Sequence, residues 1–322
     1  MFLYSCQQNL INTNQQLKAV LKFICSESHK LTNSGIYYAR HVYFKIRKIV
    51  NKFDLINEYK SNKHYQVVYS QVAKQSLISV AESFKSFKAL DEKYKRGELT
   101  NKPKLLQYRK SGFALVTYPK QVLILVGDKI RVPLGTTVKR WFSLEECWLK
   151  MPSNLNFRDI KEVRILPRNC CFYAEFVCQS QPEGKPQLTL DKCLGIDTGI
   201  NNWLTCISNV GTSFIIDGKH LKSVNQWCNK LVSNIKENKP QGFWSNRLAA
   251  LTKKGNHQMR YAVNKAARLV INHCLQQGIG TIVFGWNKGQ RREVDLGKKT
   301  NLTFVQIPTA KLQKRIAQMC DQ

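Results

Sequence analysis

The segment Cys193-Leu-Gly-Ile-Asp197 and the two that follow it, Asn202-Trp-Leu-Thr-Cys-Ile-Ser208 and Thr212-Ser-Phe-Ile-Ile216, set the architecture of the C-terminal part of the chain. Each is a short run rich in aliphatic, aromatic and β-branched residues, which is the composition of β-strands. Turn-forming residues separate the three runs, namely Gly199 and Asn209-Val-Gly211. The sequence therefore predicts three successive strands joined by two short turns.

A helical region with one break follows these strands. It spans roughly residues 222–277 and is interrupted at Pro240-Gln-Gly242. Thr281-Ile-Val-Phe284 then predicts a fourth strand, and residues 310–322 predict a final helix. Strand, hairpin, hairpin, helix, strand and helix is the order of a ribonuclease H-like α/β domain with a helical insertion.

The part of the chain before residue 190 has a helical pattern in its first half and a strand pattern in its second half. Residues 13–95 carry apolar side chains at helical spacing, and residues 96–112 form a polar linker. Short apolar runs separated by turns begin at Phe113 and predict a small β-barrel. The predicted fold class is α+β, with a helical lobe and linker at 1–112, a barrel at 113–189, and the ribonuclease H-like domain, incomplete at its C-terminus, at 190–322.

The net charge of the chain is strongly positive. Its 322 residues contain 51 Lys and Arg against 21 Asp and Glu, which gives +30. Self-repulsion of this size favours a protein that works with a polyanion, and nucleic acid is the first candidate. The alternative is that the charge only keeps the protein in solution.

The cysteines and the apolar runs argue against several other classes. Eleven cysteines are scattered without a Cys-x-x-Cys pair, so neither a zinc ribbon nor a redox motif is indicated. The N-terminus lacks the features of a signal peptide, and the longest apolar run, residues 122–126, is too short to span a bilayer. We expect a cytoplasmic protein with reduced thiols and no membrane partner.

Asp197 is the sharpest candidate for chemistry, both as a catalytic residue and as a metal ligand. A carboxylate at the end of a buried strand is held rigidly at a sheet edge, where it can bind a divalent metal ion for phosphodiester hydrolysis. Taken alone, Leu194-Gly-Ile-Asp-Thr-Gly199 fits an Asx turn equally well. The same string also occurs in actin-like kinases, where the Asp faces ATP and Mg²⁺.

The surrounding sequence resembles the TnpB/OrfB proteins of bacterial insertion sequences. The resemblance extends over nearly the whole chain. The segments that carry it are Gly195-Ile-Asp-Thr-Gly-Ile-Asn-Asn202, Asn209-Val-Gly-Thr212, Asp217-Gly-Lys-His-Leu-Lys-Ser-Val-Asn225, Thr281-Ile-Val-Phe-Gly-Trp-Asn-Lys-Gly289, Asn301-Leu-Thr-Phe-Val-Gln-Ile-Pro308, Ala81-Glu-Ser-Phe-Lys-Ser-Phe-Lys88 and Met151-Pro-Ser-Asn-Leu-Asn156.

This resemblance implies a mobile-element protein whose relatives are RNA-guided DNA endonucleases related to type V CRISPR effectors. It implies a helical recognition lobe, a wedge-like β-barrel and a RuvC nuclease domain with Mg²⁺ as cofactor. The implied partners are DNA and a transposon-derived guide RNA, which pairs with one strand while the protein reads a short flanking motif.

The acidic motifs depart from the family pattern. Many members carry a second acid, a Glu, at the end of the fourth strand, where this chain has Gly285. A relocated Glu, the third acid and any zinc ribbon would lie after the final helix, beyond Gln322. Asp217, Glu293 and Asp295 are interpreted as solvated loop residues. We therefore expect no cleavage by this chain. The alternatives are a nuclease-dead regulator and, less favoured, an actin-like kinase, which would need a second Asp-Gly motif and a neutral or acidic surface.

Basic residues concentrate in the helical region and in the loop after the fourth strand. Residues 236–292 contain eleven Lys and Arg and one acid, so pairing within the segment cannot neutralise them and a phosphate-facing surface is favoured over a solvated one. The candidate nucleic-acid ligands are Arg247, Lys253, Lys254, Arg260, Lys265, Arg268, Lys288, Arg291 and Arg292.

A second basic segment lies in the N-terminal lobe, where cations alternate with aromatic residues. Such rings can stack on unpaired bases. Packing of the rings into the helical core explains the pattern at least as well. The residues concerned are Arg40, Lys45, Arg47 and Lys48, with Tyr37, Tyr38, Tyr43 and Phe44.

Overall fold

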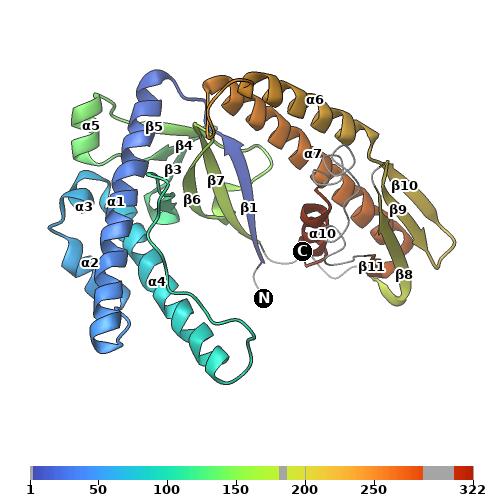
Figure 1. Cartoon of the computed structure of the whole chain (residues 1–322), viewed down its shortest axis with the longest axis horizontal. Helices are drawn as coiled ribbons and strands as arrows, with labels where there is room; N and C mark the ends of the chain where they lie inside the picture. Colours follow the sequence, from blue (N-terminus) through green and yellow to red (C-terminus); the bar gives the residue numbers. More distant parts are fainter. Residues whose placement is uncertain (1–2, 181–186, 200, 286–307, 322) are drawn as a thin grey trace. The chain divides into compact units, whose positions relative to one another are not determined.

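The structure is a computed structural model that describes residues 3–180, 187–199, 201–285 and 308–321 (Figure 1). The chain divides into two compact units, an N-terminal unit, Phe2–Ser180, and a C-terminal unit that begins at Gln181. Each unit is a mixture of helices and strands, as the α+β prediction requires. None of the helices in the described ranges is long and apolar enough to cross a membrane.

The N-terminal unit begins with a strand and continues with four helices. These are β1 (Leu3–Leu10), α1 (Gln15–Ile46), α2 (Lys52–Tyr59), α3 (Lys63–Val67) and α4 (Ser70–Lys95). The second half of the unit holds β2 (Val116–Pro119), β3 (Ile124–Val126), β4 (Lys129–Val132), α5 (Thr136–Phe142), β5 (Cys147–Lys150), β6 (Ile160–Arg168) and β7 (Cys171–Ser180), with short 3₁₀ turns at Lys120–Val122 and Phe157–Asp159.

The strands of this unit form two open sheets, so the predicted barrel is corrected. One sheet has the order β1-β7-β6-β2 and the other the order β3-β4-β5, and neither closes on itself among the described residues. Closure needs one hydrogen-bonded ladder around the whole circumference. Strands β3, β4 and β5 hold three or four residues each and pair only with one another. Strand β1 pairs along its whole length with β7 and was not predicted.

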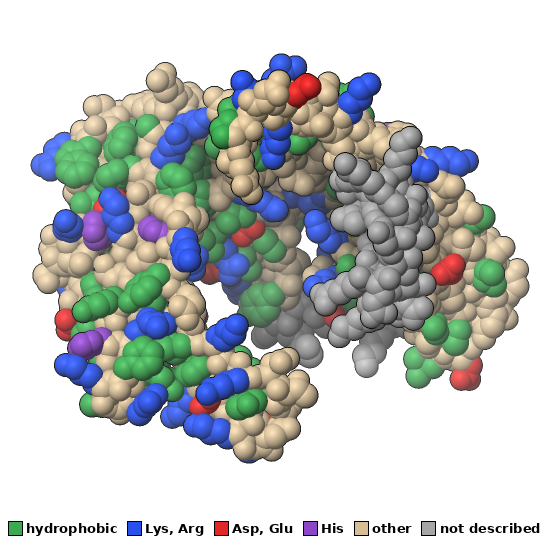
Figure 2. All heavy atoms as spheres, in the orientation of Figure 1, with side chains coloured by type: hydrophobic (Ala, Val, Ile, Leu, Met, Phe, Trp, Pro, Cys, Tyr) green, Lys and Arg blue, Asp and Glu red, His purple; other side chains and the backbone are tan. Residues whose placement is uncertain are grey.

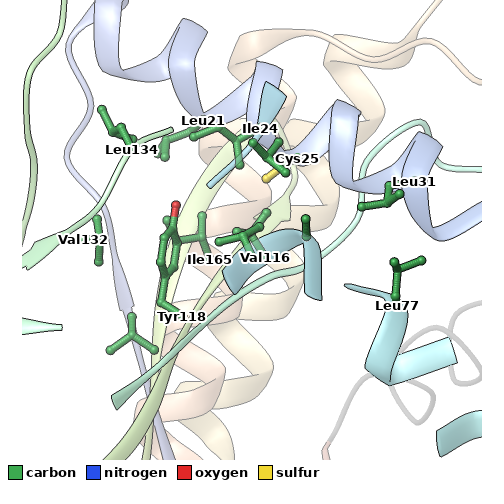
Figure 3. Packing of buried hydrophobic residues seen from close by; sticks show 14 of the residues in the cluster. Leu21, Ile24, Cys25, Leu31, Leu77, Val116, Tyr118, Val132, Leu134 and Ile165 are labelled. Carbon is green, nitrogen blue, oxygen red and sulfur yellow. The ribbon is translucent and has the colours of Figure 1, made fainter. Parts of the chain in front are cut away.

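The core of the N-terminal unit lies between α1, α4 and the four-stranded sheet. On α1 the buried residues Leu21, Ile24, Ser28, Leu31 and Gly35 recur every three or four positions, which places them on one face. Figure 3 shows Leu21, Ile24 and Cys25 facing Val116, Tyr118 and Ile165 of the sheet. A Cβ on Gly35 would lie 2.9 Å from Leu77 Cδ2 of α4, so this glycine allows the two helices to approach closely.

One buried carboxylate ties α1 to α3. Glu27 Oε2 lies 2.6 Å from His64 Nδ1, and Glu27 Oε1 accepts a hydrogen bond of 2.6 Å from Lys30 Nζ. Burial raises the pKa of Glu27, but the hydrogen bonds and charges of Lys30 and His64 outweigh it, so the net pKa lies below the ordinary value. A buried charge is tolerated here because it has two partners.

The C-terminal unit contains all four predicted strands. They are β8 (Thr189–Thr198), β9 (Asn202–Ser208), β10 (Ser213–Asp217) and β11 (Ile279–Phe284), in the sheet order β10-β9-β8-β11. Strand β11 runs parallel to β8, whereas the other pairs are antiparallel. The helices are α6 (Lys219–Lys236), α7 (Asn246–Gln277) and α10 (Thr309–Cys320).

Helices α7 and α10 cover one face of this sheet. The shared core includes Leu194 and Ile196 of β8, Val270 of α7, and Leu312 and Ile316 of α10. Because side chains alternate along a strand, Gly195 and Asp197 lie on the opposite face of β8, and both are exposed.

Candidate functional site

Asp197 is the penultimate residue of β8, and its exposed side chain lies on the face that α7 and α10 do not cover. It pairs with Thr205 of β9. The turn that follows is tight, because the Gly199 N–H donates to the Trp203 carbonyl at 3.2 Å and a Cβ on Gly199 would lie 2.6 Å from the Asn202 oxygen. Gly199 is thus required by close packing, and it fixes the backbone two residues after Asp197.

Gly285 follows directly after the last residue of β11 and lies beside Asp197. Strands β8 and β11 are parallel, so both end at the same edge of the sheet, and the Gly285 N–H donates to the Ile196 carbonyl at 2.8 Å. A Cβ built on Gly285 would lie 3.6 Å from Asp197 Oδ1. An acid at position 285 would therefore reach the carboxylate of Asp197, and glycine supplies no ligand.

The described residues do not make up a magnesium site. Among the described ranges, no group of three or more His, Cys, Asp or Glu residues lies close enough to hold a metal ion. Mg²⁺ prefers six oxygen ligands and is held by carboxylates together with waters or phosphates. Asp197 alone offers one carboxylate, so the expected Mg²⁺ does not fit this set of residues.

The order of the sheet separates Asp217 from Asp197. Asp217 ends β10, which β9 separates from β8 in the sheet. Its Oδ1 accepts a hydrogen bond of 2.8 Å from the Lys219 N–H, so its side chain is engaged by the first turn of α6. Glu293 and Asp295 lie outside the described residues.

The predicted basic residues on α7 fall into separate groups. Lys265 and Arg268 are exposed and share a stripe with Tyr261, whose side chain is 70 % exposed. Spacings of four and three residues place these three side chains on one side of the helix. Val263 and Val270 are buried on the opposite side. This stripe offers two cations and one free ring face to a ligand.

A second group lies nearer the start of α7. Arg260 Nη2 lies 3.5 Å from His257 Nδ1. Burial first, and then the charges of Arg260 and Lys253, lower the pKa of His257. A proton on His257 is therefore disfavoured, because two cations already occupy this side of the helix.

The remaining candidate basic residues lie apart from these two groups. Lys254 Nζ is 5.1 Å from the ring centroid of Trp227 on α6, and Arg247 is exposed in the first turn of α7, which has no acidic residue. On the face drawn in Figure 2, Lys and Arg side chains greatly outnumber Asp and Glu. Lys288, Arg291 and Arg292 lie outside the described residues. Trp227 and Tyr261 were missed as binding candidates, although Tyr261 follows directly after Arg260 in the sequence.

One solved structure identifies the class of fold. The chain is similar to Cas12f1, a type V CRISPR effector, in a structure described as "Cryo-EM structure of the Cas12f1-sgRNA-target DNA complex". The TM-score is 0.54 and the identity 10%, with 96% of this chain and 72% of that chain covered. A second structure, "Cryo-EM structure of CRISPR-Cas12f Ternary Complex", gives a TM-score of 0.36 at 11% identity and covers 95% of this chain and 70% of that one. The first similarity shows that the chain has a Cas12f-like fold.

A family model matches the part of the chain that contains Asp197 and Gly285. Residues 175–291 match the OrfB_IS605 family, described as "Probable transposase". The match confirms the predicted resemblance of this part of the chain to the TnpB/OrfB proteins. No curated protein matches the chain in sequence.

Proposed function

We propose that the chain is a TnpB-like protein of a mobile element that binds DNA and a guide RNA, and that residues 1–322 do not cleave DNA by themselves. In this proposal residues 1–112 serve as a recognition lobe, 113–189 as a wedge and 190–322 as a partial RuvC domain. Asp197 is the one RuvC carboxylate of the described residues, and the basic residues of α7 are phosphate ligands.

The observation that carries the binding proposal is the charge of the segment from α6 to α7. Residues 219–277 hold eleven Lys and Arg and one acid, Glu237. Ten positive charges therefore remain after any pairing within the segment. Phosphates neutralise such a surface and release condensed counterions, which is the main source of nucleic-acid affinity. The structural relative described above was solved with sgRNA and target DNA, which supports the same class of partner.

The proposal that the chain does not cleave DNA rests on the position of Gly285, which lies beside Asp197 and offers no carboxylate. Cleavage by two metal ions needs both ions held about 4 Å apart, one for the attacking water and one for the leaving oxygen. One carboxylate cannot fix both ions. This geometry also favours the second candidate function, a nuclease-dead nucleic-acid-binding regulator, over an active nuclease. The Asp197 string lies within the transposase match, which argues against a kinase.

The test uses purified residues 1–322. We expect the protein to copurify with host RNA, and we expect its affinity for RNA and DNA to fall steeply with salt, with a log–log slope of about 0.7–0.9 per phosphate contact. Affinity that does not change with salt would contradict the binding proposal. With Mg²⁺, guide RNA and a matching target, no cutting is expected from wild type or Asp197→Ala. Cutting by wild type that Asp197→Ala abolishes would overturn the cleavage proposal.

A further inference from the structure

One face of α1 exposes aromatic rings that take no part in the core. Arg40 and His41 lie three and four positions after Tyr37, and Phe44 lies four and three positions after them, so the four residues share one side of the helix. Tyr108, from the segment after α4, completes the set. The side chains of Tyr37, Phe44 and Tyr108 are 61 %, 56 % and 43 % exposed. We call these five residues the α1 aromatic surface.

The neighbouring rings of the same helix do pack against other elements. Tyr38 makes an edge contact with Tyr59 at 6.2 Å, and Tyr43 makes one with Phe87 at 5.7 Å. Both also lie against the hydrophobic core. The structure thus separates the aromatic residues of this helix into packed rings and exposed rings. Tyr38 and Tyr43 are held by the core, whereas Tyr37 and Phe44 lie outside it, and Phe44 makes an edge contact with Tyr43 at 5.9 Å between ring centroids.

The α1 aromatic surface is held in place before any ligand binds. The Arg40 guanidinium carbon lies 5.3 Å from the Phe44 ring centroid and 5.6 Å from that of Tyr108, and Arg40 Nη1 donates to the Leu106 carbonyl at 2.9 Å. The Tyr37 and His41 rings are stacked, with 6.0 Å between centroids and 16° between planes.

The segment that carries Tyr108 is fastened to α1 at a second point. Asn33 Nδ2 donates to the Arg109 carbonyl at 3.0 Å, and the Arg109 N–H donates back to Asn33 Oδ1 at 2.9 Å. Leu105 and Leu106 pack against the core from the same segment. Rings fixed in this way lose little conformational freedom on binding, which favours affinity.

The charge around the surface defines its ligand. Residues 37–53 contain five Lys and Arg and no acid, and residues 101–112 contain four Lys and Arg and no acid. Exposed rings among cations match a polyanion that presents flat apolar groups, which describes a nucleic-acid strand with unpaired bases. In a duplex the base faces are already stacked on one another. A protein partner would have to supply acidic residues throughout its contact area.

We propose that the α1 aromatic surface binds an unpaired stretch of nucleic acid, with bases stacked on Tyr37, Phe44 and Tyr108 and phosphates near the surrounding cations. This inference rests on the proposed nucleic-acid-binding function and adds to it a place and a preference for single strands. The shared chemistry is the unpaired base, whether the strand is RNA or DNA.

The test compares oligonucleotides of about 15 nucleotides, oligo(U), oligo(dT) and a duplex, on the full chain. The variant Tyr37→Leu/Phe44→Leu/Tyr108→Leu keeps every charge. We expect it to bind the single strands at least about tenfold more weakly, since each stacked base contributes of that order. Binding to duplex and the salt slope should not change, because no cation is removed. Loss confined to oligo(U) or to oligo(dT) would identify the strand as RNA or as DNA.

Two control variants separate stacking from other effects. Tyr37→Phe/Tyr108→Phe keeps the rings and should keep the affinity. Tyr4→Leu removes a ring of β1 that is 67 % exposed and lies outside the surface, and it too should keep the affinity. The substituted side chains are exposed, so circular dichroism and thermal melting should match wild type.

The outcomes also separate this inference from the proposed function. One outcome is that wild type binds single strands and duplex while the triple variant binds single strands as tightly as wild type does. In that case the inference is wrong, the proposed function stands, and the surface is a protein contact. An equal loss for single strands and duplex also overturns it. If wild type binds neither, both the inference and the proposed function fail.

Discussion

Introducing a carboxylate at position 285 should create a metal site beside Asp197. Gly285 has ordinary backbone geometry rather than a positive φ, and its Cβ would lie 3.6 Å from Asp197 Oδ1 and 3.3 Å from the Ile196 carbonyl oxygen. The second distance is tight but needs a shift of only a few tenths of an ångström. Gly285→Glu should therefore fold, with its carboxylate able to reach the same ion as Asp197.

Without metal, the variant should be less stable than wild type. Two like charges about 4 Å apart repel by about 1 kcal/mol in water. A divalent cation between them reverses this effect. At a Mg²⁺ concentration of about ten times the Kd, binding to the folded state stabilises it by about 1.4 kcal/mol. For a unit of this size that corresponds to a rise in Tm of about 3–6 °C.

The assay is thermal melting of wild type, Gly285→Glu, Gly285→Gln and Asp197→Asn/Gly285→Glu over a Mg²⁺ titration at constant ionic strength. Only Gly285→Glu should gain stability with Mg²⁺, because Gly285→Gln fills the same space without charge and the double variant removes the partner. Equal Mg²⁺ responses in all four proteins would refute the geometry argued for Asp197 and position 285.

Three further predictions concern the fold and the basic stripe. Gly199→Ala should lower the free energy of unfolding by about 1–3 kcal/mol, because its Cβ would lie 2.6 Å from the Asn202 oxygen; an unchanged denaturation midpoint would contradict this. Lys265→Gln/Arg268→Gln should weaken duplex binding and reduce the salt slope by about 0.9 per cation, with Tm unchanged; a lower Tm at constant affinity would show a structural stripe. Glu27→Gln should destabilise most at neutral pH. Because the pKa of the Glu27 carboxyl is lowered in the folded state, the carboxylate stabilises the fold above the unfolded-state pKa, and this contribution is lost as pH falls through the folded-state pKa. A stability difference between wild type and Glu27→Gln that does not change with pH would exclude this contribution.

The C-terminal sheet could be predicted because its information is local. The alternation of buried Leu194 and Ile196 with exposed Gly195 and Asp197 is visible in the sequence, and Gly199 marks the turn. The pairing of Gly285 with Ile196 follows once β11 is placed parallel to β8. That step needs the sheet order, which no local pattern contains.

The edge strand β1 of the N-terminal sheet could not be predicted, for the opposite reason. Strand β1 is the polar run Leu3–Leu10, and it becomes a strand because β7 offers it a free edge. The segment 101–112 likewise could not be placed from its sequence, which has no periodicity. It is held by the side chains of Arg40 and Asn33 on α1, which form hydrogen bonds with its backbone. Contacts between a side chain and a remote backbone leave no repeat in the sequence.

Binding and cleavage depend on different residues of the C-terminal unit, so one can be lost without the other. The sheet is held by apolar residues such as Leu194, Ile196 and Val270, none of which needs a carboxylate at the strand ends. Glycine in place of an acid at position 285 removes one negative charge from beside Asp197, which relieves repulsion in the absence of metal and adds to the positive charge that attracts phosphate. Glycine at position 285 thus supplies no metal ligand beside Asp197, while the sheet and the positive charge of the helices do not depend on one. In the function proposed above, the basic helices α6 and α7 would therefore continue to bind nucleic acid without a second carboxylate at position 285.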